Sequence, residues 1–173
     1  MSYKILVAID KSEIGQHVFD EAVSLAKALS ADLRLLHVLN PFEQPYVYPI
    51  ALPPTLLYPM LPTENAANYP ESWQALEREG MEFLTSLRNQ ALASGVTCDM
   101  TQHLGDPSRM ICDFARSWNA DLIIMGRRGC SKLSEFFLGS VSNYVTHHAP
   151  CSILIVQGHV PTEVPQQAQT TSA

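Results

Sequence analysis

The residues with the clearest chemical meaning are three glycines and a serine near the C-terminal end. Gly126 and Gly129 are followed by Gly139 and Ser140, and an apolar run over 121–125 precedes them. In a strand–loop–helix arrangement, the missing Cβ of glycine lets backbone N–H groups approach phosphate oxygens closely. The helix that follows adds unpaired donors and the positive end of its dipole. The pattern predicts a nucleotide ligand; the competing interpretation is that these glycines only form turns.

No residue of the chain combines the type and the context of a catalytic group. Ser140 is a possible nucleophile, but no histidine and carboxylate accompany it at the same strand ends to complete a hydrolytic triad. The lysine of a G-x4-G-K-[S/T] loop is also missing. His147 and His148 are adjacent, so they point to different sides of a helix and are poorly placed to share a metal ion. A favourable interaction of a histidine cation with the C-terminal end of the helix dipole is the better explanation. We therefore assign no catalytic residue and leave metal ligands unknown.

Three charged residues are candidates for ligand contacts. Asp10 closes the first apolar segment, where it is either a helix-capping carboxylate or a group that faces a ligand. Arg127 and Arg128 follow Gly126, and an arginine beside a triphosphate would add charge-assisted hydrogen bonds. The alternative for both arginines is a solvated loop charge.

The elements that must position these residues alternate between strands and helices. The first segment is almost continuously apolar, as in a strand buried on both faces, and Ser12 then precedes a helical period as its N-cap. Alternating strands and helices predict an α/β fold, a five-stranded parallel sheet with helices on both faces. Ligands of such sheets bind at the carboxyl ends of the strands, where the strand order reverses, so Asp10, Val38 and Gly126 should converge. The expected strands are 3–10, 32–38, 96–103, 122–125 and 151–156, and the expected helices are 12–29, 71–93, 107–119 and 139–148.

Helical spacing also predicts which side chains are buried. In the first helix the apolar stripe comprises Phe19, Ala22, Val23, Ala26 and Leu29. In the long second helix the expected buried side is formed by Trp73, Leu76, Met81, Phe83, Leu84, Leu87 and Leu92.

Composition limits the class of protein. With 173 residues, 46% of them hydrophobic and 16% charged, the chain fits one soluble globular domain. A net charge of −6 argues against nucleic acid as a partner, because phosphate backbones require a basic face. No apolar run approaches the roughly 20 residues of a membrane span, and no cleavable leader pattern is seen, so a cytoplasmic location is expected. The four cysteines form no CxxC pair, and we expect free thiols.

A proline-rich segment interrupts the alternation. Residues 41–70 hold eight of the twelve prolines and four of the six tyrosines, which rules out a long helix or a central strand there. We expect an insertion that forms a lid or a subunit-bridging arm, with a disordered insertion as the alternative. The predicted organisation is a nucleotide-binding domain over 1–157, carrying this insertion, and a mobile tail over 158–173.

Four features together resemble the universal stress protein family, in particular its ATP-binding branch. They are the strand Ile5–Asp10 followed by Ser12, the strand that ends in His37-Val38, the glycine pattern, and Ala149-Pro150-Cys151 before the last strand. The family's nucleotide signature, G-x2-G-x9-G-[S/T], is met in its spacing. The resemblance covers about residues 3 to 157 outside the proline-rich segment. The stretch Cys130-Ser131-Lys132 departs from the family's common Arg-Ser-Gly or Arg-Thr-Gly.

The resemblance implies a Rossmann-like fold of the adenine nucleotide alpha hydrolase type. It further implies an adenine nucleotide, ATP or else AMP or ADP, with Mg²⁺, and a homodimer formed through the last strand, Ile153–Val156. The implied role is a sensor or regulatory module in the stress response, and the alternatives are a slow ATPase or phosphotransferase and a structural partner-binding subunit without ATP. By the same resemblance, Asp10 lies beside the ribose or the metal–phosphate region, and Ala8, Ile9 and Val38 border the adenine. Met125 and Gly126 form the floor, and the phosphates are held by Gly129, Gly139, Ser140, Val141 and Ser142. Arg127 remains a candidate phosphate contact on its charge alone.

Overall fold

The computed structural model describes residues 2–40, 69–127 and 139–157. Of the predicted lid or arm over 41–70, residues 41–68 lie outside these ranges, as do the tail from 158 and Arg128, Gly129 and Cys130. Tyr69 and Pro70 instead begin a helix, where proline is tolerated in the first turn. The elements are β1 (Lys4–Ala8), α1 (Glu13–Leu29), β2 (Asp32–Leu39), α4 (Tyr69–Ala93), β3 (Cys98–Leu104), α5 (Pro107–Trp118), β4 (Leu122–Gly126), α6 (Ser140–His148) and β5 (Ser152–Val156).

The strands form a parallel sheet in the order β3-β2-β1-β4-β5. The chain proceeds outward from β1 to β2 and β3, then crosses back to β4 and ends at the edge strand β5. The order therefore reverses between β1 and β4, where crevices form in sheets of this kind. This arrangement confirms the predicted fold class, and it places the last strand at a sheet edge as expected.

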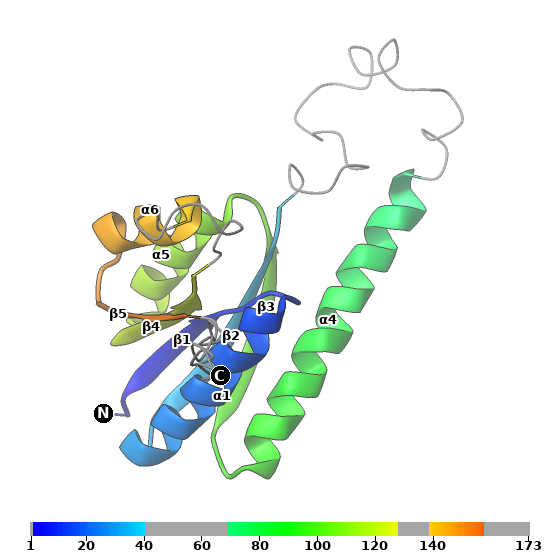
Figure 1. Ribbon diagram of the computed structural model, residues 1–173. Coiled ribbons are helices and arrows are strands. Elements are labelled where there is room, and N and C mark those ends of the chain that lie inside the picture. The colour runs from blue at the N-terminus through cyan, green and yellow to red at the C-terminus, as the bar shows by residue number, and fades with distance from the viewer. Residues whose placement is uncertain (1, 41–68, 128–138, 158–173) are drawn as a thin grey trace, which may run out of the picture.

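Each face of the sheet carries its own hydrophobic core. Ile5 and Val7 of β1 pack with α1 and α4, whereas Leu6 between them packs with α5 and α6. Figure 1 shows the two layers, with α1 and α4 on one side of the strands and α5 and α6 on the other. The alternation follows from the two-residue period of a strand, and it explains why β1 is apolar throughout.

Helix α1 begins and ends where local chemistry requires. The Ser12 hydroxyl accepts the Gly15 N–H, and Ser30 adopts a left-handed conformation with φ of 52° at the C-cap. The predicted stripe is correct for Phe19, Ala22 and Ala26. It is wrong for Leu29, which is 46% exposed, because the buried face ends at Ala26 and Leu29 belongs to the last, exposed turn of the helix.

Helix α4 is the longest element and contacts the sheet with a narrow face. Leu84, Leu87 and Ala91 are buried, at the spacing of one helix face. Met81 and Leu92, both predicted to be buried, are 40% and 43% exposed. Each follows a buried residue by one position and is thus rotated by about 100° around the helix axis. The helix ends at Ala93, and Gly95 follows as the predicted C′ residue with a φ of +81°. Within the described ranges, no helix has the length and apolar character needed to cross a bilayer.

Candidate functional site

A cavity opens at the carboxyl ends of β1, β2 and β4, beneath the first turns of α1, α5 and α6. It therefore lies at the reversal of strand order, where the parallel sheet predicts a ligand. Its lining residues are Ala8, Ile9, Asp10, Ser12, Ile14, Gly15, Val18, Leu36, Val38, Pro107, Ile111, Met125, Gly126, Gly139, Ser140, Val141 and Ser142.

The structure brings together most of the residues that the sequence singled out. Arg127 is not among the lining residues; its backbone N–H donates to the Val156 carbonyl at 2.9 Å, which continues the pairing of β4 with β5. Gly129 lies outside the described residues. The predicted residues that line the cavity are Ala8, Ile9, Asp10, Val38, Met125, Gly126, Gly139, Ser140, Val141 and Ser142.

One half of the cavity is apolar and flanks an open strand end. The β1–β2 ladder stops at the Ala8–Leu36 pair, whereas the β2–β3 ladder continues to Leu39–Leu104. Strand β2 thus extends past β1, and Val38 lies beyond the last residue pair on that side. Beyond Leu36, β2 has no pairing partner among the described residues on the side of β1. Apolar walls beside such an unpaired strand edge suit a flat heteroaromatic ring that can form hydrogen bonds with the backbone of the strand. The apolar wall is formed by Ala8, Leu36, Val38, Pro107, Ile111 and Met125.

The other half contains the first turn of α6. Two of the three described helices that begin at the cavity have a side-chain cap, from the Ser12 hydroxyl in α1 and the Asp106 carboxylate in α5. Helix α6 has Gly139 as its N-cap and no side-chain cap hydrogen bond. Its first N–H groups are therefore not occupied by a capping side chain, and the dipole of the helix favours an anion there. Ser140 and Ser142 add hydroxyl groups to this wall, and the Ser142 hydroxyl also reaches the Gly139 carbonyl at 3.4 Å.

Asp10 supports the N-cap residue of α1 and also lines the cavity. Its Oδ1 accepts the Ser12 N–H at 3.0 Å and a hydrogen bond from the Ser12 hydroxyl, so it belongs to the start of α1. The same residue lines the cavity. Ser12 therefore holds the carboxylate in place and caps the helix through its bond from the Gly15 N–H. Within the described lining, Asp10 is the one charged side chain.

Two of the glycines are required by packing against α1. A Cβ at Gly126 would lie 2.6 Å from Ile14 Cγ2, and a Cβ at Gly15 would lie 2.1 Å from the Asp10 carbonyl oxygen. The first glycine of the signature thus lets α1 approach the end of β4, a requirement that the phosphate-loop interpretation did not foresee. Gly15 carried no sequence signal of its own because a glycine in a first helical turn has no distinctive neighbours.

The three cysteines within the described ranges do not line this cavity. Cys98 and Cys112 are buried, Cys151 is half-buried, and all three are free thiols, which confirms the expectation for these residues. Burial raises the pKa of Cys98 to about 11, so this thiol stays protonated at neutral pH. Among the described residues, no group of three His, Cys, Asp or Glu side chains is arranged to hold a metal ion.

Comparison with known proteins identifies relatives along nearly the whole chain. The Universal stress protein family matches residues 1–157. Universal stress protein Sll1388 of Synechocystis is 38% identical over 158 residues, which are 89% of this chain and 97% of the relative. Universal stress protein YxiE of Bacillus subtilis is 32% identical and is covered over its full length by 91% of this chain.

Solved structures share the fold. The hypothetical protein MJ0577 superposes with a TM-score of 0.70 at 22% identity, over 92% of this chain and 98% of that protein. The universal stress protein of Archaeoglobus fulgidus in complex with dAMP has a TM-score of 0.58 at 20% identity, over 88% and 96% of the two chains. The Arabidopsis thaliana family protein At3g01520, with AMP bound, has a TM-score of 0.59 at 21% identity, over 95% and 96%.

Proposed function

Because the chain belongs to the universal stress protein family, we propose that its cavity binds an adenine nucleotide and that the protein acts as a regulatory module in the stress response. The observation that carries this proposal is the pairing of two unlike halves in one cavity. An apolar wall lies beside the open end of β2, and the first turn of α6 has no capping side chain. A nucleotide has this same division, into a flat base and an anionic phosphate.

The individual contacts follow from the lining residues. The base would lie against Ala8, Ile9 and Met125, with the backbone of Val38 at its edge. The phosphates would lie at Gly139, Ser140 and Val141, where N–H groups and a hydroxyl can donate to them. AMP and dAMP bound to structural relatives support an adenine ligand.

We propose ATP as the ligand, accompanied by Mg²⁺. Magnesium usually takes one or two protein carboxylates together with substrate phosphates, and Asp10 supplies one carboxylate at the cavity. The unit that carries this function would span 1–157, the range matched by the family.

The experiment that tests the proposal is the identification of copurified ligand. Protein purified without added nucleotide would be denatured, and the released small molecules would be measured by mass spectrometry. We expect AMP, ADP or ATP in a fixed ratio to the chain. A ligand of another chemical class in that ratio would contradict the proposal. Release of phosphate from added ATP, measured in parallel, separates a regulatory module from a slow ATPase.

We also propose that two chains pair through β5. This strand is at the sheet edge, and Leu154, at its centre, is 38% exposed. Uncovered apolar edges of soluble proteins tend to be paired, and a two-fold axis would place each Leu154 near its symmetry copy.

Leu154→Lys should therefore weaken the homodimer at least tenfold, because it places like charges across the axis. Ile155 is a poorer choice for this test, since its side chain packs against the core between the sheet and α5 and α6. Sedimentation equilibrium would measure the dissociation constant. Leu29→Lys, at a leucine that is 46% exposed on α1, is the matched control and should leave assembly unchanged. A wild-type protein that is monomeric at about 100 μM would refute pairing through β5.

A further inference from the structure

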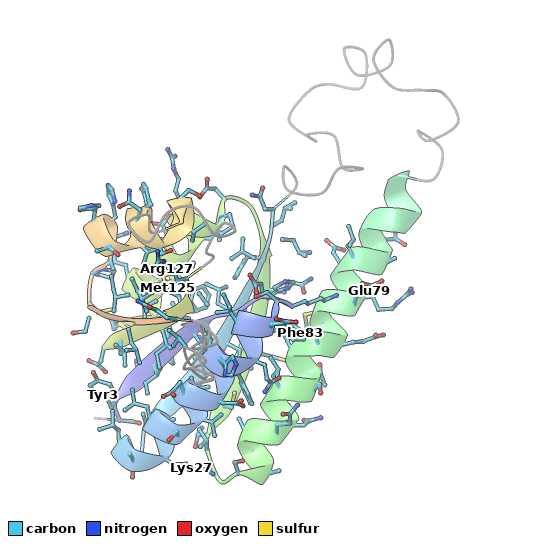
Figure 2. The ribbon with its side chains drawn as sticks, viewed as in Figure 1. Tyr3, Lys27, Glu79, Phe83, Met125 and Arg127 are labelled. Carbon is cyan, nitrogen blue, oxygen red and sulfur yellow. The ribbon has the colours of Figure 1, made fainter. Side chains whose placement is uncertain are left out.

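A buried histidine lies directly behind the cavity. His37 precedes Val38 on β2 and, by the alternation of the strand, faces α4 on the other side of the sheet. It is 7% exposed, and its ring meets Phe83 of α4 edge-on, with 6.0 Å between ring centroids. Figure 2 shows Phe83 on the side of α4 that is turned toward the sheet. The proposed function uses Val38 and leaves His37 without a role.

A chain of hydrogen bonds joins this ring to the backbone of α4. His37 Nδ1 lies 3.3 Å from Gln102 Oε1, and Gln102 Nε2 donates to the Glu77 carbonyl at 3.1 Å. Because the amide nitrogen of Gln102 is directed at a carbonyl, its oxygen must face the ring. Nδ1 therefore carries the proton and donates it, which defines the tautomer of the neutral histidine.

Helix α4 approaches the strands very closely at this point. A Cβ added at Gly80 would lie 2.1 Å from Gln102 Oε1 and 3.0 Å from His37 Nδ1. Only a glycine fits here without a shift of its neighbours. Because the His37 residue is only 7% exposed, a charged imidazolium would lose most of its hydration.

A second link connects the same turn of α4 to the cavity. Lys11 Nζ lies 3.2 Å from Glu79 Oε2, with side chains that are 44% and 58% exposed. An exposed ion pair contributes little stability by itself. Its position is informative, however, because Lys11 lies between Asp10 and Ser12, which both line the cavity. The turn 77–80 of α4 thus lies against Lys11 and His37, and the residues on either side of each of these in the sequence line the cavity.

The charge environment determines how this contact responds to acid. Burial lowers the pKa of His37 below its ordinary value of 6.5. The hydrogen bond that the ring donates to Gln102 raises this pKa, the charge of Lys11 lowers it, and the charge of Asp10 raises it. Among the described residues, the charges of Lys11 and Asp10 come from the connection between β1 and α1. Strand β3 contributes the neutral amide of Gln102. Helix α4 contributes the carbonyl of Glu77, which bonds to Gln102, and the carboxylate of Glu79, which pairs with Lys11.

The sign of the effect follows from the lowered value. When α4 packs on the strands, His37 binds a proton less readily than it does when its ring is in water. The packing of α4 on the strands is therefore most stable above pH 6.5, and it becomes less stable as the pH falls through the lowered pKa of His37.

We propose that the contact of His37 and Gln102 with the Gly80 turn of α4 is an acid-released latch. It is closed while the ring is neutral, and protonation opens it and loosens the β1–α1 connection and β2, which line the cavity. The effect on the cavity rests on the proposed nucleotide function; the opening of the latch does not.

Hydrogen exchange of the full chain tests the latch without any nucleotide. Amides of residues 77–84 in α4 would be compared with those of α5 at pH 7.5 and 5.5, after correction for intrinsic exchange rates. We expect the protection of the α4 amides to fall at least tenfold relative to α5. In His37→Gln this response should disappear, because the introduced amide donates to Gln102 at either pH and cannot take up a charge.

A matched control is available on the neighbouring strand. His103 follows Gln102 on β3 but lies on the other face, where it contacts Thr101 and Phe114. His103→Gln should keep the full pH response of α4. Equal losses of protection in α4 and α5, or a response that survives in His37→Gln, would overturn the latch.

If His37→Gln fails to fold, a pH titration of the wild-type protein followed by NMR tests the latch. The ring signal of His37 and the amide signals of residues 77–84 should titrate with one midpoint below pH 6.5. A ring that titrates while these amides stay unchanged would contradict the latch.

The effect on the cavity is tested by measuring the Kd for ATP at pH 7.5 and 5.5 in the wild type and in His37→Gln. For each protein, the Kd at pH 5.5 is divided by the Kd at pH 7.5, and the wild-type value is then divided by the value for His37→Gln, so that protonation of the nucleotide itself cancels. We expect this final ratio to be at least three. A ratio of one would overturn the effect on the cavity. No binding of ATP at pH 7.5 would count against the proposed function, and the exchange data would still decide the latch.

Discussion

Gly139→Asp should weaken the binding of adenine nucleotide by at least about a hundredfold while leaving the protein as stable as the wild type. Aspartate is among the best N-cap residues, so it would accept hydrogen bonds from the first N–H groups of α6. These are the donors that we assign to phosphate. The new carboxylate would also lie near the phosphates, and two like charges at about 4 Å repel by about 4 kcal/mol at an effective dielectric constant of about 20. Isothermal titration calorimetry with ATP measures the loss.

The geometry of Gly139 makes this a test of the ligand and not of the backbone. Its φ of −56° and ψ of 158° are accessible to any residue. Gly139→Ser is the matched control, since serine caps without a charge and should cost much less affinity. Denaturant unfolding of both variants would verify the fold. Unchanged affinity for ATP in a folded Gly139→Asp protein would remove α6 from the phosphate site.

Gly15→Ala should destabilise the fold by about 2 kcal/mol, although alanine is the better helix former by about 1 kcal/mol. The added methyl group would lie 2.1 Å from the Asp10 carbonyl oxygen and 3.3 Å from its Oδ1. The obstacle is backbone, which cannot rotate away, so α1 or the end of β1 must shift. Urea unfolding would measure the free energy of unfolding, and the displaced Asp10 should weaken nucleotide binding in the same variant.

Gly80→Ala is the informative comparison for Gly15. Its introduced methyl group would meet the end of the flexible Gln102 side chain at the same 2.1 Å. Gln102 can rotate, so the loss of stability should be smaller than for Gly15→Ala. Equal losses at the two positions would mean that the approach of α1 to Asp10 is no more restrictive than a side-chain contact.

The sequence predicted the architecture because the strong periodic signals agreed with one another. The unbroken apolar run of β1 and the alternation of strands with helices led to a parallel sheet, and the Ser12 and Asp106 caps placed two helix starts correctly. The convergence of Asp10, Val38 and Gly126 followed from sheet topology alone. Errors in burial fell on residues adjacent to a buried face, such as Met81, where helical spacing does not say how wide the contact is.

The residues that could not be predicted from the sequence are those whose role depends on how helices and strands pack together. Pro107 and Ile111 line the cavity because α5 packs beside β2, which no local pattern in α5 reveals. Gly80 has no signal as a contact residue, since a glycine inside a helix is usually only a weak helix former. Its meaning appears when Gln102 and His37 are found against it. The sequence also assigned Gly126 to ligand binding alone, whereas a Cβ at this position would collide with Ile14 of α1.

Calorimetric titration of nucleotide-free wild-type protein with ATP, ADP and AMP, alongside Gly139→Asp, tests the central claim most directly. The cavity that joins the open end of β2 to the uncapped start of α6 predicts saturable binding at one site per chain, with the heat lost in the variant. Figure 2 labels Met125, which lines the cavity near the end of β4 and would contact the base. Absence of binding by all three nucleotides up to about 1 mM, which corresponds to about −4 kcal/mol, would contradict the assignment.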